Sequence, residues 1–262
     1  MPDIEQKKIQ IDLNADIGEG FDDSAIIPWL SSANISCGAH AGTEAQIRLA
    51  LRLCRQYRVA VGAHPSYPDR QNFGRLAIDI PLSKLRAELQ QQLDYFLKLA
   101  NEEGVTVCHL KAHGALYNVA AQDASTGALL LELGRDYQLA LMTLAQSPLH
   151  LTAIQQRLPV IAEAFADRAY QRNGQLVPRS QPGALLDAPA AISQSLLLVQ
   201  QQKVQALDGD LLTLAADSLC LHGDSPDAVT LAQKLHQALL QQDIIIQAKS
   251  CHLFSSEAPW TL

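Results

Sequence analysis

The stretch VCHLKAHGALY, residues 107–117, places His109, Lys111 and His113 at every second position. Successive side chains of a β-strand point to opposite faces, so these three basic side chains share one face. The residues between them are apolar and share the other face. The stretch therefore predicts a strand with one apolar face and one face that carries ionisable groups.

The same alternation marks the first predicted strand, residues 9–18, where Asp12, Asn14 and Asp16 alternate with apolar residues. A doubly wound sheet has helices on both faces, and its strands are nearly continuous apolar runs. A closed β/α barrel instead turns one strand face toward helices and the other toward the barrel axis. The sequence therefore predicts an α/β fold, a distorted TIM-like (β/α) barrel of seven or eight strands.

Segments with strand character are followed in several places by longer helical patterns, which is typical of repeated β-α units. Thr43 and Gln46 predict a capping box, and Ser83 is expected to cap a helix that stops near Gly104. Ser225 is expected to cap a further helix. Asn173-Gly174 predicts a turn in a hairpin or loop excursion near the active face. The expected strands are residues 9–18, 33–40, 59–64, the segment from Val105, and residues 149–154, 159–165, 218–223 and 243–248.

Composition limits the function classes. The chain has 262 residues, 48% hydrophobic and 18% charged, and we expect one domain over residues 1–262. Its net charge of -7 is scattered without long runs, so neither nucleic acid nor a membrane surface is an expected partner. No signal peptide or transmembrane stretch is evident, and a cytoplasmic location is expected. Five cysteines without a CxxC pair indicate neither a disulfide framework nor a zinc ribbon.

Catalytic groups of β/α barrels gather at the C-terminal ends of the strands. Four histidines at four predicted strand ends favour one shared site, whereas His109 lies deeper and is interpreted as a satisfied interior group. His150 and His236 are interpreted as structural, and His252 is left unassigned. The predicted rim consists of Asp16, Glu19, His40, His64, Lys111, His113, Glu163, Asp167 and His222.

Histidine and carboxylate groups in this pattern also suit a divalent metal such as zinc or iron. The expected metal ligands are His40, His64 and His222. The sequence has no HExxH motif, and it leaves open whether a metal is bound. It also lacks a complete dinucleotide fingerprint and a GxxxxGK[ST] loop, so nucleotide binding through either of these motifs is not expected. It has no GxSxG elbow, which disfavours a serine hydrolase.

At these residues the sequence resembles the LamB/YcsF family. The resemblance covers nearly the whole chain in order. It is carried by DLNADIGEGF from Asp12, NISCGAHAG from Asn34, VGAHPSYPDRQNFGR from Val61, HLKAHGALYN from His109, EAFADRAYQRNGQLVPRSQPGA from Glu163 and CLHGDSP from Cys220.

The resemblance implies a barrel similar to those of the glycoside hydrolases and polysaccharide deacetylases. It further implies ATP-dependent opening of the lactam of 5-oxo-L-proline to L-glutamate, with ATP as cofactor and with 5-oxoprolinase subunits B and C as partners. The partners could supply part of the nucleotide site, which would account for the missing nucleotide motifs.

Within that expectation, ATP activates the lactam oxygen and water then attacks the carbonyl carbon. Asp16 or Glu163 is the expected general base. Lys111 and His113 are expected to stabilise the oxyanion and the phosphoryl oxygens. These expectations rest on the predicted rim of the barrel, because Asp16, Glu163, Lys111 and His113 all belong to it.

An arginine side chain is well suited to bind the substrate carboxylate, because two guanidinium N–H groups can donate to the two carboxylate oxygens. Arg75, Arg168 or Arg179 is expected to hold it. The other expected substrate-binding residues are Asn14, Asn34, Tyr117 and Asp167.

Two rival interpretations remain open. The first is a stand-alone metal-dependent deacetylase or amidohydrolase with Asp16, His40 and His64 as ligands. The second is a non-catalytic scaffold subunit whose barrel binds subunits B and C.

Overall fold

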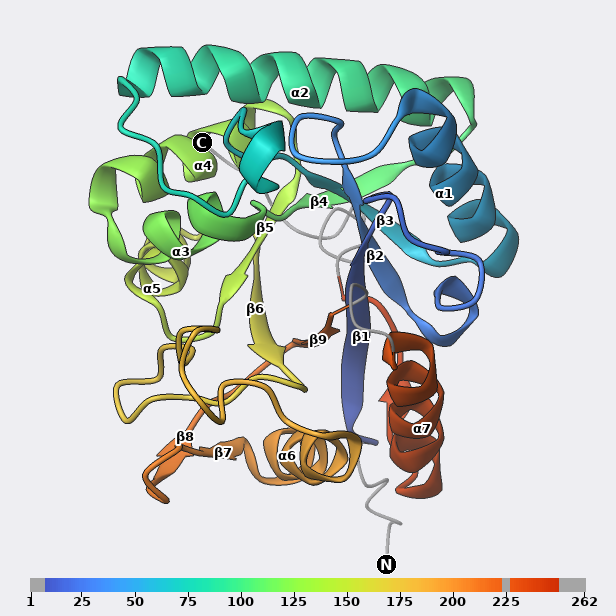
Figure 1. Ribbon diagram of the computed structural model, residues 1–262, viewed down its shortest axis with the longest axis vertical. Helices are drawn as coiled ribbons and strands as arrows, with labels where there is room; N and C mark the ends of the chain where they lie inside the picture. Colours follow the sequence, from blue (N-terminus) through green and yellow to red (C-terminus); the bar gives the residue numbers. More distant parts are fainter. Residues whose placement is uncertain (1–7, 223–226, 250–262) are drawn as a thin grey trace, which may run out of the picture.

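The computed structural model describes residues 8–222 and 227–249. Seven parallel strands form a ring in the order β1-β2-β3-β4-β5-β6-β9, and pairing of β9 with β1 closes it. The short β10 pairs with the start of β1. The predicted β/α barrel is therefore confirmed (Figure 1). The strands are β1 (Gln10–Ile17), β2 (Ser32–Ser36), β3 (Ala60–His64), β4 (Val107–Leu110), β5 (Ala140–Leu144), β6 (Val160–Phe165), β9 (Ser218–Leu221) and β10 (Ile245–Ile246).

Helices surround the ring on its outer side (Figure 1). A small antiparallel pair of strands, β7 and β8, follows α6 and stands apart from the ring. No helix in the described part of the chain is long and apolar enough to cross a membrane. The remaining elements are η1 (Ile27–Trp29), α1 (Glu44–Tyr57), η2 (Arg70–Asn72), α2 (Leu82–Glu102), α3 (Gly114–Gln122), α4 (Ala124–Asp136), α5 (Pro148–Gln155), α6 (Ala188–Gln201), β7 (Lys203–Gln205), β8 (Leu211–Thr213) and α7 (Ala228–Gln241).

The two faces of β1 separate apolar from polar side chains. Leu13 and Ile17 belong to the main buried apolar cluster, which lies between the strands and the helices. Asp12 and Asn14 are equally buried, but they hydrogen-bond on the inner face of the ring to Ser218 of the neighbouring strand β9. The period of two thus sends hydrophobic side chains outward and hydrogen-bonding groups into the barrel.

The helices are held to the ring by apolar burial. In α2, Leu89, Leu93 and Phe96 share one face and are completely buried. Burial of such a side chain contributes about 1.5–3 kcal/mol each. In α1 the predicted capping box is confirmed, because the Thr43 side chain accepts from the backbone of Gln46 and the Gln46 side chain accepts from the backbone of Thr43. The loop that precedes α1 is thereby fixed at the barrel mouth.

The fifth β/α unit differs from the prediction. Residues 149–154, expected to be a strand, lie in α5, and the strand of this unit is β5, which was missed. Ser147 caps α5 by accepting from the backbone of His150, and Pro148 occupies its first turn. β5 is buried on both faces and shows no polar alternation, so its sequence resembles a continuation of the apolar helix α4 before it.

Other local expectations had mixed outcomes. The helix after Pro81 begins at Leu82 without a side-chain cap, so the expected cap at Ser83 was wrong. The turn at Asn173-Gly174 is confirmed by the antiparallel bridge between Tyr170 and Leu176 that it joins. The predicted cap at Ser225 and the unassigned His252 lie outside the described residues.

Candidate active site

A lysine paired with two carboxylates forms the floor of the barrel mouth. The Nζ of Lys111 lies 2.8 Å from Oδ1 of Asp16 and 2.8 Å from Oε1 of Glu163. Burial would lower the pKa of Lys111, but the negative charges, with Asp16 first, outweigh it and raise the pKa well above its usual value. Burial likewise opposes ionisation of Asp16, yet the charges of His64 and Lys111 hold its pKa well below the usual range. The floor therefore keeps a fixed positive charge next to an ionised carboxylate.

Two asparagines connect these carboxylates deeper in the barrel. The Nδ2 of Asn34 donates to Oδ1 of Asp16 and to Oδ1 of Asn14, at 2.8 Å in both cases. The Nδ2 of Asn14 donates in turn to Oε1 of Glu163 at 3.1 Å and to Ser218. Both asparagines are completely buried. Their hydrogen bonds orient the carboxylates from below, and neither side chain lines the cavity described below.

His109 supports the same network. Its Nε2 donates to Oδ1 of Asn34 at 2.7 Å, and burial followed by the charge of Lys111 lowers its pKa to about 3. The ring fits because residue 62 is glycine: a Cβ at Gly62 would lie 2.1 Å from Nε2 of His109. The interior position expected for His109 is confirmed, but the group is not fully satisfied, because its Nδ1 is buried without a hydrogen-bond partner among the described residues.

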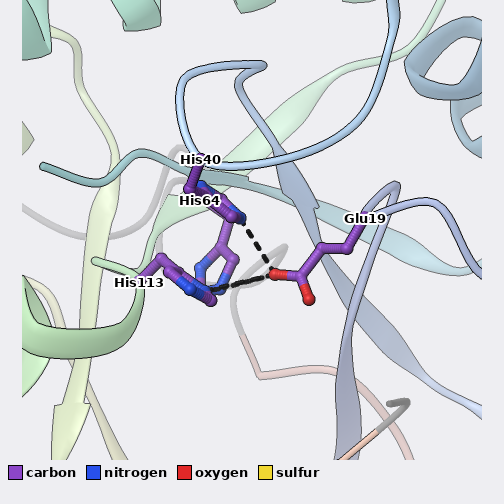
Figure 2. A group of neighbouring side chains, drawn as sticks. All are labelled: Glu19, His40, His64 and His113. Atoms are coloured by element: carbon purple, nitrogen blue, oxygen red, sulfur yellow. Dashed lines mark hydrogen bonds and ion pairs between the residues drawn. The ribbon is translucent and has the colours of Figure 1, made fainter. Parts of the chain in front are cut away.

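Three histidines and one glutamate gather on one side of the mouth (Figure 2). They come from the ends of neighbouring strands: Glu19 follows β1, His40 follows β2, His64 ends β3 and His113 follows β4. One ligand atom from each lies within 4.8 Å of all the others, and all four residues are buried. This is a donor set that divalent transition metals accept.

The contacts within this His-Glu cluster are close. Oε1 of Glu19 lies 3.0 Å from Nε2 of His40 and 3.2 Å from Nδ1 of His113. Burial would raise the pKa of Glu19, but hydrogen bonds from His113 and His40 outweigh it and lower the pKa to about 2. Burial also lowers the pKa of His40 to about 4, so this imidazole is neutral at pH 7.

Backbone carbonyls orient two of the rings. Nδ1 of His64 donates to the carbonyl of Lys111 at 2.8 Å, and Nε2 of His113 donates to the carbonyl of Phe73 at 2.9 Å. Such second contacts fix the tautomer of metal-binding histidines. The remaining nitrogens, Nε2 of His64 and Nδ1 of His113, lie 3.0 Å apart. In addition, Nδ1 of His40 is buried without a hydrogen-bond partner among the described residues. The residues thus fit a divalent metal.

His222 stands apart from the His-Glu cluster, contrary to its expected place among the metal ligands. It follows β9, which is three strands from β3 in one direction around the ring and three from β4 in the other. Its Nδ1 donates to the carboxylate of Asp167 at 2.8 Å, and its ring stacks on Phe165. Asp167 is occupied by this pair and does not line the cavity. The candidate metal ligands beside His40 and His64 are therefore Glu19 and His113, and not His222.

A cavity of about 540 Å³ joins these groups at the C-terminal ends of the strands. Of the residues predicted for the site, it is lined by Asp16, Arg75, Lys111, His113, Tyr117, Arg168, Arg179 and His222, together with Glu19. Asn14, Asn34, His40, His64, Glu163 and Asp167 lie behind this lining.

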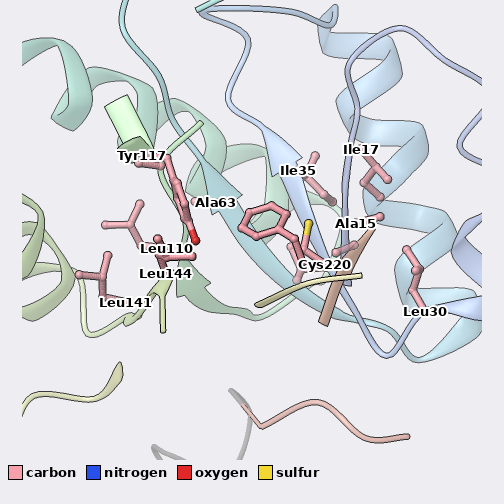
Figure 3. Close-up of a cluster of buried hydrophobic side chains, with 14 of the residues drawn as sticks. Ala15, Ile17, Leu30, Ile35, Ala63, Leu110, Tyr117, Leu141, Leu144 and Cys220 are labelled. Atoms are coloured by element: carbon pink, nitrogen blue, oxygen red, sulfur yellow. The ribbon is translucent and has the colours of Figure 1, made fainter. Parts of the chain in front are cut away.

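Two lining residues carry a buried polar atom that has no hydrogen-bond partner among the residues that the structure describes. Nη2 of Arg168 donates to the carbonyl of Val177 at 2.6 Å, but its buried Nε has no hydrogen-bond partner in the described ranges. Burial, and after it the charge of Arg179, lowers the pKa of Arg168. Tyr117 lies in the main apolar cluster with Leu110 and Leu144 (Figure 3), and within the described residues its buried hydroxyl makes no hydrogen bond either.

Glu19 was predicted at the rim but not as a ligand. The signal available in the sequence is its position three residues after Asp16, just past the first strand. Nothing in that spacing shows that the loop after β1 carries it toward His40.

Comparison with known proteins agrees with this architecture. The family model described as LamB/YcsF family matches residues 11–253. A relative from Neisseria meningitidis serogroup A, named as the A subunit of 5-oxoprolinase, is 44% identical over 243 residues, covering 91% of this chain and 99% of the relative.

Solved structures show the same fold. The lactam utilization protein from Thermus thermophilus superposes with a TM-score of 0.86 at 36% identity, over 92% of this chain and 100% of that one. A family 4 carbohydrate esterase from Streptomyces lividans gives a TM-score of 0.50 at 10% identity, over 91% of both chains, which is a likeness of fold alone. With a family model that spans most of its length, this chain belongs to the LamB/YcsF family.

Proposed function

We propose that this chain is the A subunit of an ATP-dependent 5-oxoprolinase, which opens the lactam of 5-oxo-L-proline. The observation that carries the proposal is the 44% identity to a protein named as that subunit, nearly all of whose length is matched. In the complete reaction, 5-oxo-L-proline, ATP and two waters give L-glutamate, ADP and phosphate. The partners are subunits B and C of the same enzyme.

The cavity suits a small anionic substrate. Its volume of about 540 Å³ lies within the range usual for small-molecule sites. Arg75, Arg168 and Arg179 line it and provide guanidinium groups for the substrate carboxylate. Among these, Arg168 has a buried Nε with no hydrogen-bond partner in the described chain, and a bound carboxylate would supply one.

The floor of the barrel mouth is suited to stabilise negative charge on the lactam oxygen. ATP activates the lactam oxygen, and Lys111, whose pKa is raised by its carboxylate neighbours after the opposing effect of burial, stays cationic beside it. A fixed cation in a water-poor site stabilises an oxyanion or phosphoryl group more than it would in water. We assign the orientation and deprotonation of the attacking water to Asp16, which lines the cavity. Glu163, completely buried behind it, positions Lys111.

The His-Glu cluster is the proposed divalent metal site, held by Glu19, His40, His64 and His113. When bound, such a metal supplies Lewis acidity that polarises a carbonyl or phosphoryl oxygen. Of its residues, Glu19 and His113 line the cavity, so this wall meets the substrate.

The same cluster favours one second candidate, a metal-dependent deacetylase or amidohydrolase that acts without partners. Hydrolysis of acetylated sugars or simple amides by the metal-loaded chain alone would support it. The absence of such hydrolysis would leave the oxoprolinase proposal as the better account.

The decisive experiment is 5-oxoproline-dependent ATP hydrolysis and glutamate release, measured with this chain and subunits B and C together and with each omitted. We expect full activity only when all are present. Lys111→Ala and Asp16→Ala should each abolish glutamate release. Full activity in both variants would show that the barrel is a scaffold and not the catalytic site.

A further inference from the structure

Asp167 and His222 form a pair on the side of the barrel mouth opposite the His-Glu cluster. His222 Nδ1 lies 2.8 Å from Oδ1 and 3.0 Å from Oδ2 of Asp167, and the backbone N–H of His222 donates to the same carboxylate at 3.1 Å. Stacking on Phe165, with ring centroids 5.6 Å apart, fixes the plane of the imidazole. The ring is therefore held at Nδ1 and by its stacking on Phe165.

The free edge of this imidazole borders the cavity. His222 lines it, and its Nε2 makes no hydrogen bond to any residue of the described ranges. Asp167 is buried behind His222, and although burial raises its pKa, the charge and hydrogen bonds of His222 outweigh this and lower it. A carboxylate on Nδ1 with Nε2 turned toward a substrate is the arrangement by which a histidine transfers protons.

The position of the pair is also informative. β9 lies across the ring from β3 and β4, which carry His64 and His113. A substrate in the cavity would thus have the His-Glu cluster on one side and His222 on the other, with Lys111 at the floor. The two heteroatoms of the lactam bond also have different requirements. The oxygen needs stabilisation of its negative charge, and the nitrogen needs a proton before it can leave.

We propose that His222 is the general acid that protonates the departing ring nitrogen and that Asp167 is its positioning residue. The inference rests on the proposed function. The lactam oxygen first takes the terminal phosphoryl group of ATP, and ADP leaves. A water oxygen then bonds to the carbon that carries this oxygen, while the water proton passes to Asp16. When the carbon–nitrogen bond breaks, its electron pair stays on nitrogen, which takes the Nε2 proton of the imidazolium, and the carbon is left as an acyl phosphate. A second water hydrolyses this acyl phosphate to the glutamate side-chain carboxylate and phosphate. Neutral His222 remains hydrogen-bonded to ionised Asp167.

The test uses the complete complex with subunits B and C, and wild type is assayed first. His222→Asn should lower kcat for glutamate release by about 10²–10⁴-fold with little change in KM, because general acid catalysis contributes that much. His236→Asn is the matched control, since His236 donates to the carbonyl of Trp29 and lies outside the cavity. It should retain the wild-type kcat.

Two further readouts separate catalysis from structure. Imidazole added to the His222→Ala complex should restore part of the lost rate. Asp167→Asn should slow the wild-type enzyme but should not slow His222→Asn further, because Asp167 acts through His222.

An unchanged kcat in His222→Asn would overturn the inference, as would a loss that imidazole does not rescue. A wild-type complex that fails to open 5-oxoproline would instead overturn the proposed function, and the inference with it.

Discussion

Nε2 of His64 and Nδ1 of His113 lie 3.0 Å apart, while the other nitrogen of each ring donates to a backbone carbonyl. If both rings are neutral, two lone pairs face each other in a buried site. A shared proton, with one ring charged and paired with Glu19, or a bound cation removes this conflict. The geometry is therefore built around a positive charge at this point.

We expect the purified protein to bind one divalent transition metal, with release of protons because the ligands must be deprotonated. Calorimetry in buffers of different ionisation enthalpy measures the number of metal ions bound and the number of protons released. Glu19→Gln or His113→Gln should weaken binding by more than the 10–100-fold typical of second-sphere changes, and His236→Gln should not. Failure of zinc, iron, manganese and nickel to bind would contradict the metal assignment.

The sequence predicted the chemistry of individual strands better than their arrangement. The period of two around Lys111 correctly separated His109 as interior support from the groups that reach the mouth. Strand order could not be read in the same way, because β5 has no polar alternation and residues 149–154 imitate a strand. His222 was grouped with His40 and His64 because all three lie at predicted strand ends, although β9 lies across the ring from β3.

The Lys111 ion pairs should dominate the stability of the barrel interior. Lys111→Met leaves Asp16 and Glu163 buried without a cation, and we expect it to lower the free energy of unfolding by about 3–5 kcal/mol. Adding Glu163→Gln removes one uncompensated charge and should recover part of the loss. Urea unfolding of the three proteins measures this. A cost of about 1 kcal/mol or less for Lys111→Met, as for surface pairs, would show that the pairs contribute little.

Gly62 is required because His109 occupies the space of its missing side chain. A Cβ there would lie 2.1 Å from the ring, and backbone shifts of this kind cost about 1–3 kcal/mol or more. Gly62→Ala should therefore lower the thermal midpoint markedly. The double variant Gly62→Ala with His109→Ala should be more stable than the sum of the two single changes predicts. Simple additivity would mean that the two residues do not compete for this space.

His109 should make stability depend on pH. Because burial lowers its pKa to about 3, it stays neutral in the folded chain while the unfolded chain takes up a proton near the ordinary value of about 6.5. Its contribution is fully present above that pH and is lost as the pH falls toward 3, at about 1.4 kcal/mol per pH unit. Denaturant unfolding between pH 7 and 5 should show a steeper loss for wild type than for His109→Asn. Parallel curves would contradict the assignment.

Arg168 should determine the affinity for the substrate carboxylate. Its Nη2 is engaged by the carbonyl of Val177, and its buried Nε has no hydrogen-bond partner in the described part of the chain. A charge-assisted hydrogen bond contributes about 1.5–3 kcal/mol, so Arg168→Lys, which keeps the charge but loses the paired donors, should raise KM for 5-oxoproline by about 10–150-fold. The effect on kcat should be smaller, because the carboxylate does not change during ring opening. Arg172→Lys is the matched control, because Arg172 is exposed, pairs with Asp208 and Asp210, and lies outside the cavity. The KM of this control variant for 5-oxoproline should equal that of the wild type. An equal rise in KM in both variants would point to a general disturbance of the loop around Val177 and not to a carboxylate site.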